Sequence, residues 1–376
     1  MISALEIENF KCFLDLRISF GKLTLLTGFN GGGKSSAIQP LLLLAQALRA
    51  GAPLGASLPL NGRMIHLGTV GDVVPADTTK SGIRFQVTNE EAEATWITST
   101  ISGERHLHIV KATLRRLDAP LGTRRRHPSR TDSVWQSLSR LSYLSAVREG
   151  TADAYPVPEA TDENATDVGV DGRFAAYWYG KFVDEEVEVA RRHPDEPATS
   201  LRKQLDAWLS TLFPGAQANV QHVPQLSLES LQFRVSGIGD WRRPANVGYG
   251  FTYAFPILVA LLVARQGQVI VIDSPEAHLH PFAQSQMGRL LAHFAMAGVQ
   301  TVVETHSDHL LNGVRLAVKD GVLSGSDIRI LFFTGANTLG HGVFSPTVDS
   351  EGRIGDWPEG FFDQSEKDLS RLSGWD

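Results

Sequence analysis

Apolar and polar positions along the chain form two kinds of pattern. Residues 2–20 alternate between apolar and polar, which predicts two strands around a turn, and strand-like runs at 83–87, 95–102 and 106–115 predict a small antiparallel sheet. Residues 23–26, 268–272 and 299–303 are instead short, continuous apolar runs, typical of strands buried on both faces of a parallel sheet. Helical spacing follows two of them, at 37–48 and 282–295. The pattern therefore predicts an α/β fold.

The middle of the chain has a different character. Residues 133–213 read as mainly helical around an acidic, Pro- and Ala-rich loop at 150–172. We expect three parts: an N-terminal lobe at 1–115, an arginine-rich loop with a helical insertion at 116–215, and a second lobe at 216–376.

Composition narrows the class of protein. A chain of 376 residues with 42% hydrophobic residues and a net charge of -6 is typical of a soluble globular protein. No apolar run approaches the roughly 20 residues that span a bilayer, and the N-terminus lacks the pattern of a signal peptide. A single cysteine, Cys12, suits a reducing compartment. We therefore expect a cytoplasmic protein with no membrane partner.

Residues 28–35 match the pattern G-x-x-x-x-G-K-S/T between a predicted strand and a predicted helix. Glycines let backbone N–H groups close around phosphate oxygens, and the helix N-terminus adds partial positive charge. Lys34 adds a full charge, the Ser35 hydroxyl can ligate Mg²⁺, and Lys11 is placed to reach a phosphate, although an exposed strand lysine is the simpler interpretation. The loop predicts a nucleoside triphosphate site built from Asn30, Gly31, Gly32, Gly33, Lys34, Ser35 and Ser36.

The second lobe supplies complementary groups. Asp273 and His306 end two buried strands, so both are expected at the sheet edge where ligands bind, Asp273 to hold Mg²⁺ through water and His306 to sense the γ-phosphate. A second glycine turn before a helix, with Gly248, Gly250 and Thr252, is another candidate phosphate contact. An alternative assigns a metallohydrolase cluster to His278, His280, His306, Asp273 and Glu276.

In this order the motifs resemble an ABC-type ATPase head, the branch that includes SMC, RecN and the overcoming-lysogenization-defect (OLD) family. More narrowly, the chain is similar to stand-alone bacterial AAA-family ATPases that end in a short domain of unknown function and are found in defence operons. The resemblance is carried by residues 7–13, 246–250, 275–281, 304–307 and 357–364. It implies a P-loop NTPase fold of the ABC-ATPase head type, with a mixed sheet core, an antiparallel N-terminal sheet and a helical insertion.

The resemblance also implies roles for single residues. Residues 28–36 look like Walker A, Asp273 the Walker B acid, His306 the switch histidine and residues 248–252 the signature loop, with ATP and Mg²⁺ as cofactors. Two subunits of such heads sandwich two ATPs, which implies a homodimer, with a higher oligomer open. A separate effector, such as a nuclease in anti-phage defence, is the implied partner.

The chain also departs from the family pattern at positions that bear on hydrolysis and on pairing of two copies. Ser274 stands where a catalytic glutamate usually follows the Walker B acid, so Glu276 is the candidate to polarise water. Tyr253 interrupts the signature, and no Q-loop glutamine is evident. The alternative function is a slow or non-hydrolysing nucleotide-gated sensor. DNA is a further candidate partner through Arg124, Arg125 and Arg126, although a solvated surface loop explains the same residues.

Overall fold

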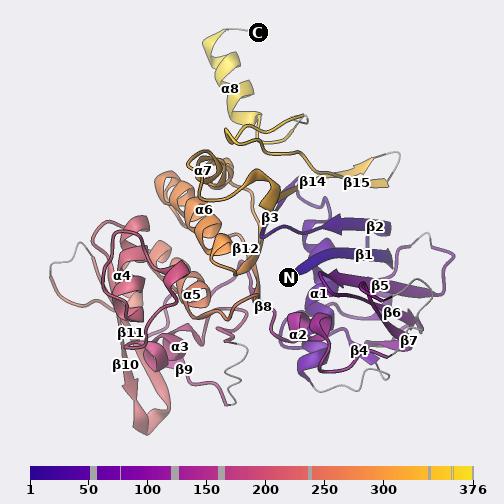
Figure 1. The fold of residues 1–376 in the computed structure, drawn as a ribbon, viewed down its shortest axis with the longest axis horizontal. Helices are drawn as coiled ribbons and strands as arrows, with labels where there is room; N and C mark the ends of the chain where they lie inside the picture. The colour runs from indigo at the N-terminus through magenta and orange to yellow at the C-terminus, as the bar shows by residue number, and fades with distance from the viewer. Residues whose placement is uncertain are drawn as a thin grey trace.

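The computed structural model describes residues 1–50, 57–76, 78–119, 127–159, 166–235, 239–337, 340–356, 358 and 360–374. Its central element is a six-stranded sheet in the order β15-β14-β3-β13-β12-β8, parallel except for β15 (Figure 1). Its strands are β3 Leu23–Gly28, β8 Ser142–Leu144, β12 Val269–Asp273, β13 Gln300–Glu304, β14 Ile328–Asn337 and β15 Gly340–Phe344. The α/β fold and the buried parallel strands predicted from the apolar runs are confirmed.

The central strands are mainly apolar because a hydrophobic core lies on each of their faces. On β12, Ile270 and Ile272 enter one core, whereas Val269 and Val271 enter the other. Successive side chains of a strand point to opposite faces, so both sets must be apolar to leave water. This double burial fixes the register of the strands, and with it the edge where their carboxyl ends meet.

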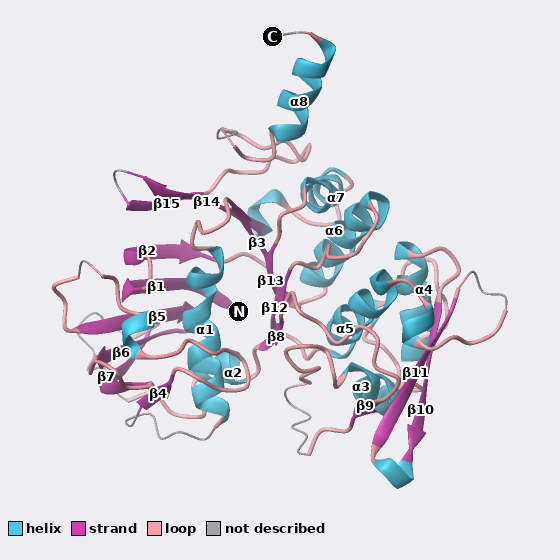
Figure 2. Ribbon diagram, turned by 180° about the vertical axis from the view of Figure 1, so that it is seen from behind, coloured by secondary structure: helices cyan, strands magenta, loops and turns pink. Residues whose placement is uncertain are grey.

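A second sheet covers one face of the central sheet. It is antiparallel, in the order β2-β1-β5-β6-β7-β4, as the alternating N-terminal pattern predicts. Its core is shared with α1 (Lys34–Arg49), which packs side chains against both sheets. Figure 2 shows α1 between this sheet and the central strands. The strands are β1 Ile2–Phe10, β2 Phe13–Ser19, β4 Ser57–Pro59, β5 Gly82–Asn89, β6 Ala92–Ser99 and β7 His106–Arg116.

Helices cover the opposite face. They are α3 Ala175–Phe182, α4 Leu201–Leu212, α5 Tyr249–Val263, α6 Pro281–Met296 and α7 Asp308–Lys319. The apolar residues from about 254 to 264 predict a helix with Pro256 in its first turn. This prediction is wrong, because α5 already begins at Tyr249 and Pro256 lies in its middle. Pro256 is buried in the helical core, and Gly172 lies so close that a Cβ there would be 2.7 Å from the proline Cβ. Tertiary burial therefore overrides the local preference against proline.

The middle segment is less purely helical than its pattern predicts. Besides α2 (Ser133–Ser139), α3 and α4, it contains β8, which pairs in parallel with β12 and so belongs to the central sheet. A small sheet of β9 (Tyr155–Pro156), β10 (Gln217–Val223) and β11 (Leu228–Arg234) packs beside α3 and α4. The three-residue β8 is too short for sequence periodicity to separate it from a buried helix.

The C-terminal segment completes the central sheet with β14 and β15 and then continues to α8 (Gln364–Ser373), which projects from the body in Figure 1. Between them, Phe361 is fully buried and contacts the ring of Phe332 on β14, edge to face at 5.2 Å. None of the helices in the described ranges is both long and apolar enough to cross a membrane.

The buried Phe361 generates a stability prediction. We expect Phe361→Ala to lower the free energy of unfolding by about 3 to 5 kcal/mol, because it opens a cavity beneath β14. Leu372→Ala, at an 84% exposed position of α8, serves as control and should change stability by less than about 0.5 kcal/mol. Urea unfolding measures both, and equal effects of the two substitutions would contradict the packing described.

Candidate nucleotide-binding site

The glycine loop joins β3 to α1, and two of its glycines are required by close backbone approach. Gly28 has φ +122°, and a Cβ there would lie 2.2 Å from the carbonyl oxygen of Phe333 on β14. Gly33, the N-cap of α1, has φ +103°, and its Cβ would lie 2.6 Å from the ring of Phe13. The loop is thus clamped between β14 and the first hairpin, which leaves the N-terminus of α1 open to an anion.

A cavity of about 360 Å³ lies over this loop. It brings together all the loop residues predicted to bind phosphate, together with Lys11 and His306. Cys12 and Glu304, which were not predicted as site residues, also line it. The complete lining is Lys11, Cys12, Asn30, Gly31, Gly32, Gly33, Lys34, Ser35, Ser36, Glu304 and His306.

Lys34 is 4% exposed, and its ammonium group donates hydrogen bonds to the carbonyl oxygens of Gly28 and Phe29, each at 3.0 Å. Burial lowers the pKa of Lys34, while the charges of Glu304 and Asp273 oppose that shift. The ammonium is therefore held inside the loop by weak neutral acceptors. A phosphate oxygen is a stronger, charged acceptor for the same group.

Two carboxylates stand side by side at the carboxyl edge of the sheet. Asp273 and Glu304 are register partners on β12 and β13, and Glu304 is also paired with Leu26 of β3. The Ser35 hydroxyl lies within hydrogen-bond distance of both oxygens of Glu304, at 2.9 and 3.1 Å. Burial, reinforced by the charge of Asp273, raises the pKa of Glu304 to about 7. Glu304 ends an apolar strand, as Asp273 does, and this position in the sequence could have marked it as a site residue.

His306 and Glu276 meet beside this edge. The backbone N–H of His306 donates to Glu276 Oε1 at 2.8 Å, whereas the buried Oε2 has no hydrogen-bond partner among the described residues. Burial, followed by the charge of Lys34, lowers the pKa of His306, which favours the neutral imidazole. The hydroxyl of Ser274 donates to Asp273 Oδ1 at 2.8 Å. The serine at the position where the family resemblance implies a catalytic glutamate therefore makes a hydrogen bond to Asp273, the predicted Walker B acid.

Strand β8, which pairs with β12 at the end of the central sheet, is followed by an arginine at the same edge. Arg148 follows β8, is 4% exposed, and donates to the carbonyl oxygens of Asp273 and Ser274. Its guanidinium carbon also lies 5.6 Å from the ring centroid of Tyr253 on α5. Burial lowers the pKa of Arg148 to about 10, so the group stays charged at neutral pH. The sequence did not single out Arg148, because nothing marked β8 as part of the central sheet.

The signature-like residues lie elsewhere. Gly248 is the N-cap of α5, and Gly250 and Thr252 lie in its first turn, not in a loop. A Cβ on Gly250 would lie 3.0 Å from the carbonyl oxygen of His278, while the Thr252 hydroxyl donates to the carbonyl of Tyr249 at 3.0 Å. Among the described residues that line the nucleotide cavity, none of these three appears. Within one copy of the chain, Gly248, Gly250 and Thr252 therefore do not line the cavity over the glycine loop.

The donor set fits Mg²⁺ and disfavours the alternative metal site. The Ser35 hydroxyl and the carboxylates of Asp273 and Glu304 are hard oxygen donors, which Mg²⁺ prefers. Within the ranges that the structure describes, no three His, Cys, Asp or Glu side chains form a group that could hold a metal ion, so the metallohydrolase cluster receives no support. The arginines at 124–126 lie outside the described residues.

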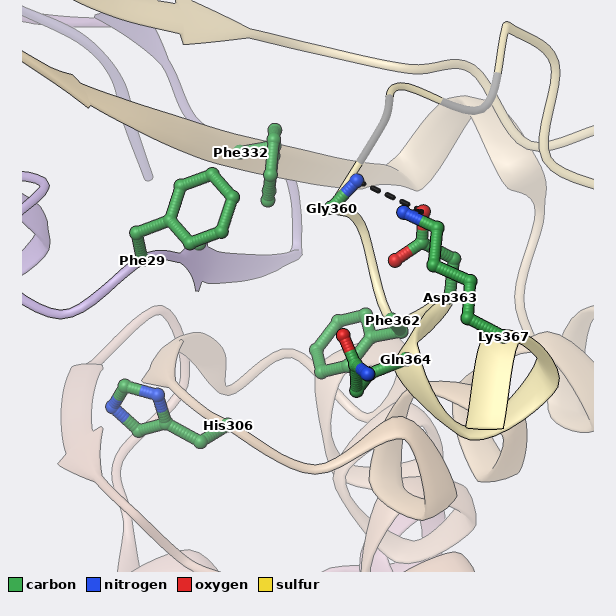
Figure 3. Close-up of a pocket in the computed structure, with 9 residues that line it drawn as sticks. Phe29, His306, Phe332, Gly360, Phe362, Asp363, Gln364 and Lys367 are labelled. Atoms are coloured by element: carbon green, nitrogen blue, oxygen red, sulfur yellow. Dashed lines mark hydrogen bonds and ion pairs between the residues drawn. The ribbon is translucent and has the colours of Figure 1, made fainter. Parts of the chain in front are cut away.

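A second cavity of about 590 Å³ adjoins the loop on its other side. Figure 3 shows Phe29 and Phe332 facing the C-terminal residues Phe362 and Lys367, with His306 below them. Gly360 has φ +81°, and a Cβ there would be 2.4 Å from the Phe29 ring. Phe29 of the glycine loop therefore packs directly on the C-terminal segment. Residues 357 and 359 of the motif that carries the family resemblance lie outside the described residues.

A glycine loop between strand and helix, facing an acid on a neighbouring parallel strand, defines the nucleotide-binding head of a P-loop ATPase. Residues 23–312 match the family model described as "AAA domain, putative AbiEii toxin, Type IV TA system", and the chain belongs to this family. Residues 323–372 match a second model, a protein of unknown function, DUF3696. The predicted combination of an AAA-family ATPase with a short C-terminal domain of unknown function is confirmed.

Solved structures agree on the fold. The chain is similar to an SMC head bound to the C-winged helix domain of ScpA, with 13% identity, a TM-score of 0.51, and coverage of 92% of this chain and 97% of that one. An SMC head domain with an extended coiled coil, bound to the C-terminal domain of ScpA derived from Pyrococcus furiosus, gives 11% identity, a TM-score of 0.52 and coverage of 99% of each chain. No curated protein matches. The predicted ABC-ATPase head fold is confirmed.

The clamped loop predicts unequal effects of two glycine substitutions. We expect Gly28→Ala to weaken ATP binding at least tenfold, because the new Cβ must displace the backbone of β14. Gly31 also has a positive φ, +74°, but nothing lies within 4 Å of its Cβ, so Gly31→Ala carries only the backbone cost of about 1 kcal/mol. Fluorescent-nucleotide titration compares the two, and Gly31→Ala being the more damaging would contradict the clamp.

Proposed function

We propose that this protein binds ATP with Mg²⁺ in the cavity over the glycine loop and hydrolyses it. The observation that carries the proposal is the meeting of the loop, Lys34 and Ser35 with Glu304 and His306 in one cavity, with Asp273 adjoining. The loop N–H groups and Lys34 would hold the phosphates. Ser35 and Asp273 would hold Mg²⁺, whose charge supports phosphoryl transfer when it is bound.

Glu276 is the residue that we assign to polarise the attacking water. Its Oε1 is fixed by the backbone of His306, which lines the cavity, and its Oε2 remains an acceptor without a partner among the described residues. The Ser274 hydroxyl cannot replace a carboxylate, and it already donates to Asp273. His306, favoured in its neutral form, would sense the γ-phosphate from the same side of the site.

We further propose that ATP draws two copies together and that this pairing controls a separate effector, such as a nuclease. Gly248, Gly250 and Thr252 stay outside the cavity of their own chain, so a second copy is needed to bring them to a nucleotide. The family description names a putative toxin of a toxin–antitoxin system, which supports a role in defence. One SMC head similar to this chain is bound to a domain of ScpA, which supports a protein partner.

One observation favours a second candidate function. The serine after Asp273 makes a hydrogen bond to that acid instead of supplying a base, which suits a slow, nucleotide-gated sensor. Such a sensor closes on ATP and opens only when triggered. The two candidate functions share the binding site and differ in the rate of unstimulated turnover.

Lys34→Ala tests whether ATP is bound and hydrolysed. Loss of a charged hydrogen-bond donor to phosphate is worth roughly 2 to 3 kcal/mol, so we expect ATP affinity to fall about 30- to 150-fold and turnover to become undetectable. Lys22→Ala removes a partly exposed ion pair with Asp327 and an exposed contact with Met296 Sδ, and it should leave affinity and turnover unchanged. Calorimetry and a phosphate-release assay give the readouts. Wild-type turnover no faster than that of Lys34→Ala would reject hydrolysis.

Glu276→Gln separates the motor from the sensor. For a motor, the amide preserves the acceptor for the His306 N–H but loses the base, so ATP should stay bound, turnover should fall at least 100-fold, and dimers should accumulate with ATP. Light scattering after size-exclusion chromatography measures the dimer. Steady unstimulated turnover that Glu276→Gln abolishes would dismiss the sensor. Wild-type ATP-bound dimers that barely turn over would instead favour it.

A further inference from the structure

Four of the parallel strands, β3, β13, β12 and β8, end at the edge of the central sheet beside the nucleotide cavity. A different side chain lies at or after the end of each. β3 leads into the glycine loop and Ser35, β12 ends at Asp273, β13 ends at Glu304, and β8 leads to Arg148. Arg148 is a buried cation whose Nη2 donates to the carbonyl oxygens of Asp273 and Ser274, whereas its Nε and Nη1 have no hydrogen-bond partner among the described residues. A guanidinium has no oxygen atom, so Arg148, which follows β8, cannot be a metal ligand at this edge.

Glu304 is the carboxylate that touches the metal-binding hydroxyl. It is 6% exposed, and both of its oxygens lie within 3.1 Å of Ser35 Oγ. A cation bound to that hydroxyl would also meet the carboxylate of Glu304. Its strand lies between β3 and β12, so the side chain is held from both sides and lies next to Asp273.

The other acids near the site are held differently. Asp273 accepts the hydroxyl of Ser274, and Glu276 accepts the backbone N–H of His306. Neither of these hydrogen bonds involves Ser35. Two carboxylates and a hydroxyl give three hard oxygen donors at one place, and Mg²⁺ bound with a triphosphate usually takes only one or two carboxylates from its protein.

We propose that Glu304 is a ligand of the Mg²⁺ that accompanies ATP, next to Ser35 and Asp273. This inference rests on the proposed function and adds a residue to its metal site. Lys34 lies close enough for its charge to oppose the burial shift of Glu304, so a nearby cation already offsets part of the repulsion between the two acids.

Manganese provides a test that does not depend on turnover. Mn²⁺ is titrated into the full chain with bound ADP and followed by electron paramagnetic resonance. We expect Glu304→Gln to weaken Mn²⁺ binding roughly 10- to 100-fold, a loss at least as large as that for outer-shell partners. ADP affinity in EDTA should stay equal or increase, because one negative charge near the phosphates is lost. The substituted amide retains an oxygen that accepts from Ser35, which preserves local packing.

The controls distinguish the inference from the function on which it rests. Glu276→Gln should slow turnover but leave Mn²⁺ affinity within about twofold of wild type, whereas Asp273→Asn should weaken it. Unchanged Mn²⁺ affinity in Glu304→Gln, with ADP still bound, would overturn the inference and leave nucleotide binding intact. If wild type and Lys34→Ala alike fail to bind nucleotide, the proposed function itself fails. Glu304→Asp, with a shorter side chain, should give an intermediate affinity if the carboxylate is a ligand.

Discussion

The parallel pairing of β3, β13 and β12 is the constraint on which the site depends. Residues far apart in the chain reach one edge because their strands share a direction and a register, with Asp273 opposite Glu304 and Glu304 opposite Leu26. The register is firm because each strand contributes apolar side chains to both cores, and a shift by one residue would move each of these side chains to the opposite core. Hydrophobic burial on two sides thus holds charged groups in place at the end of the sheet.

That arrangement concentrates acids where a polyphosphate would bind. Glu304 is buried beside Asp273, and both lie close to the ammonium of Lys34, while the guanidinium of Arg148 lies close to Asp273. The acids and the two cations partly offset one another, which reduces the cost of burying each charge. Burial, reinforced by the charge of Asp273, still raises the pKa of Glu304, so the two cations offset only part of the cost of ionising this carboxyl.

Much of this could be predicted from the sequence, because the informative patterns are local. The glycine loop, its strand and its helix lie within one short stretch, and apolar runs that end in Asp273 and before His306 mark buried strands. The proximity of Glu304 to Ser35 and of Arg148 to Asp273 was not predicted, although Glu304 does end an apolar run. Their roles arise from pairing across the sheet, and β8 is only three residues long. Pro256 was misplaced because burial, which the local pattern does not show, lets α5 start early.

The contact between Phe29 and Gly360 makes the glycine loop and the C-terminal segment thermodynamically linked. Any molecule that binds the second cavity and displaces Phe29 changes the affinity of the loop for its anion. Reciprocity then requires the anion to change that molecule's affinity by the same factor. The packing of Phe29 on Gly360 therefore couples the conformation of the glycine loop to that of the C-terminal segment.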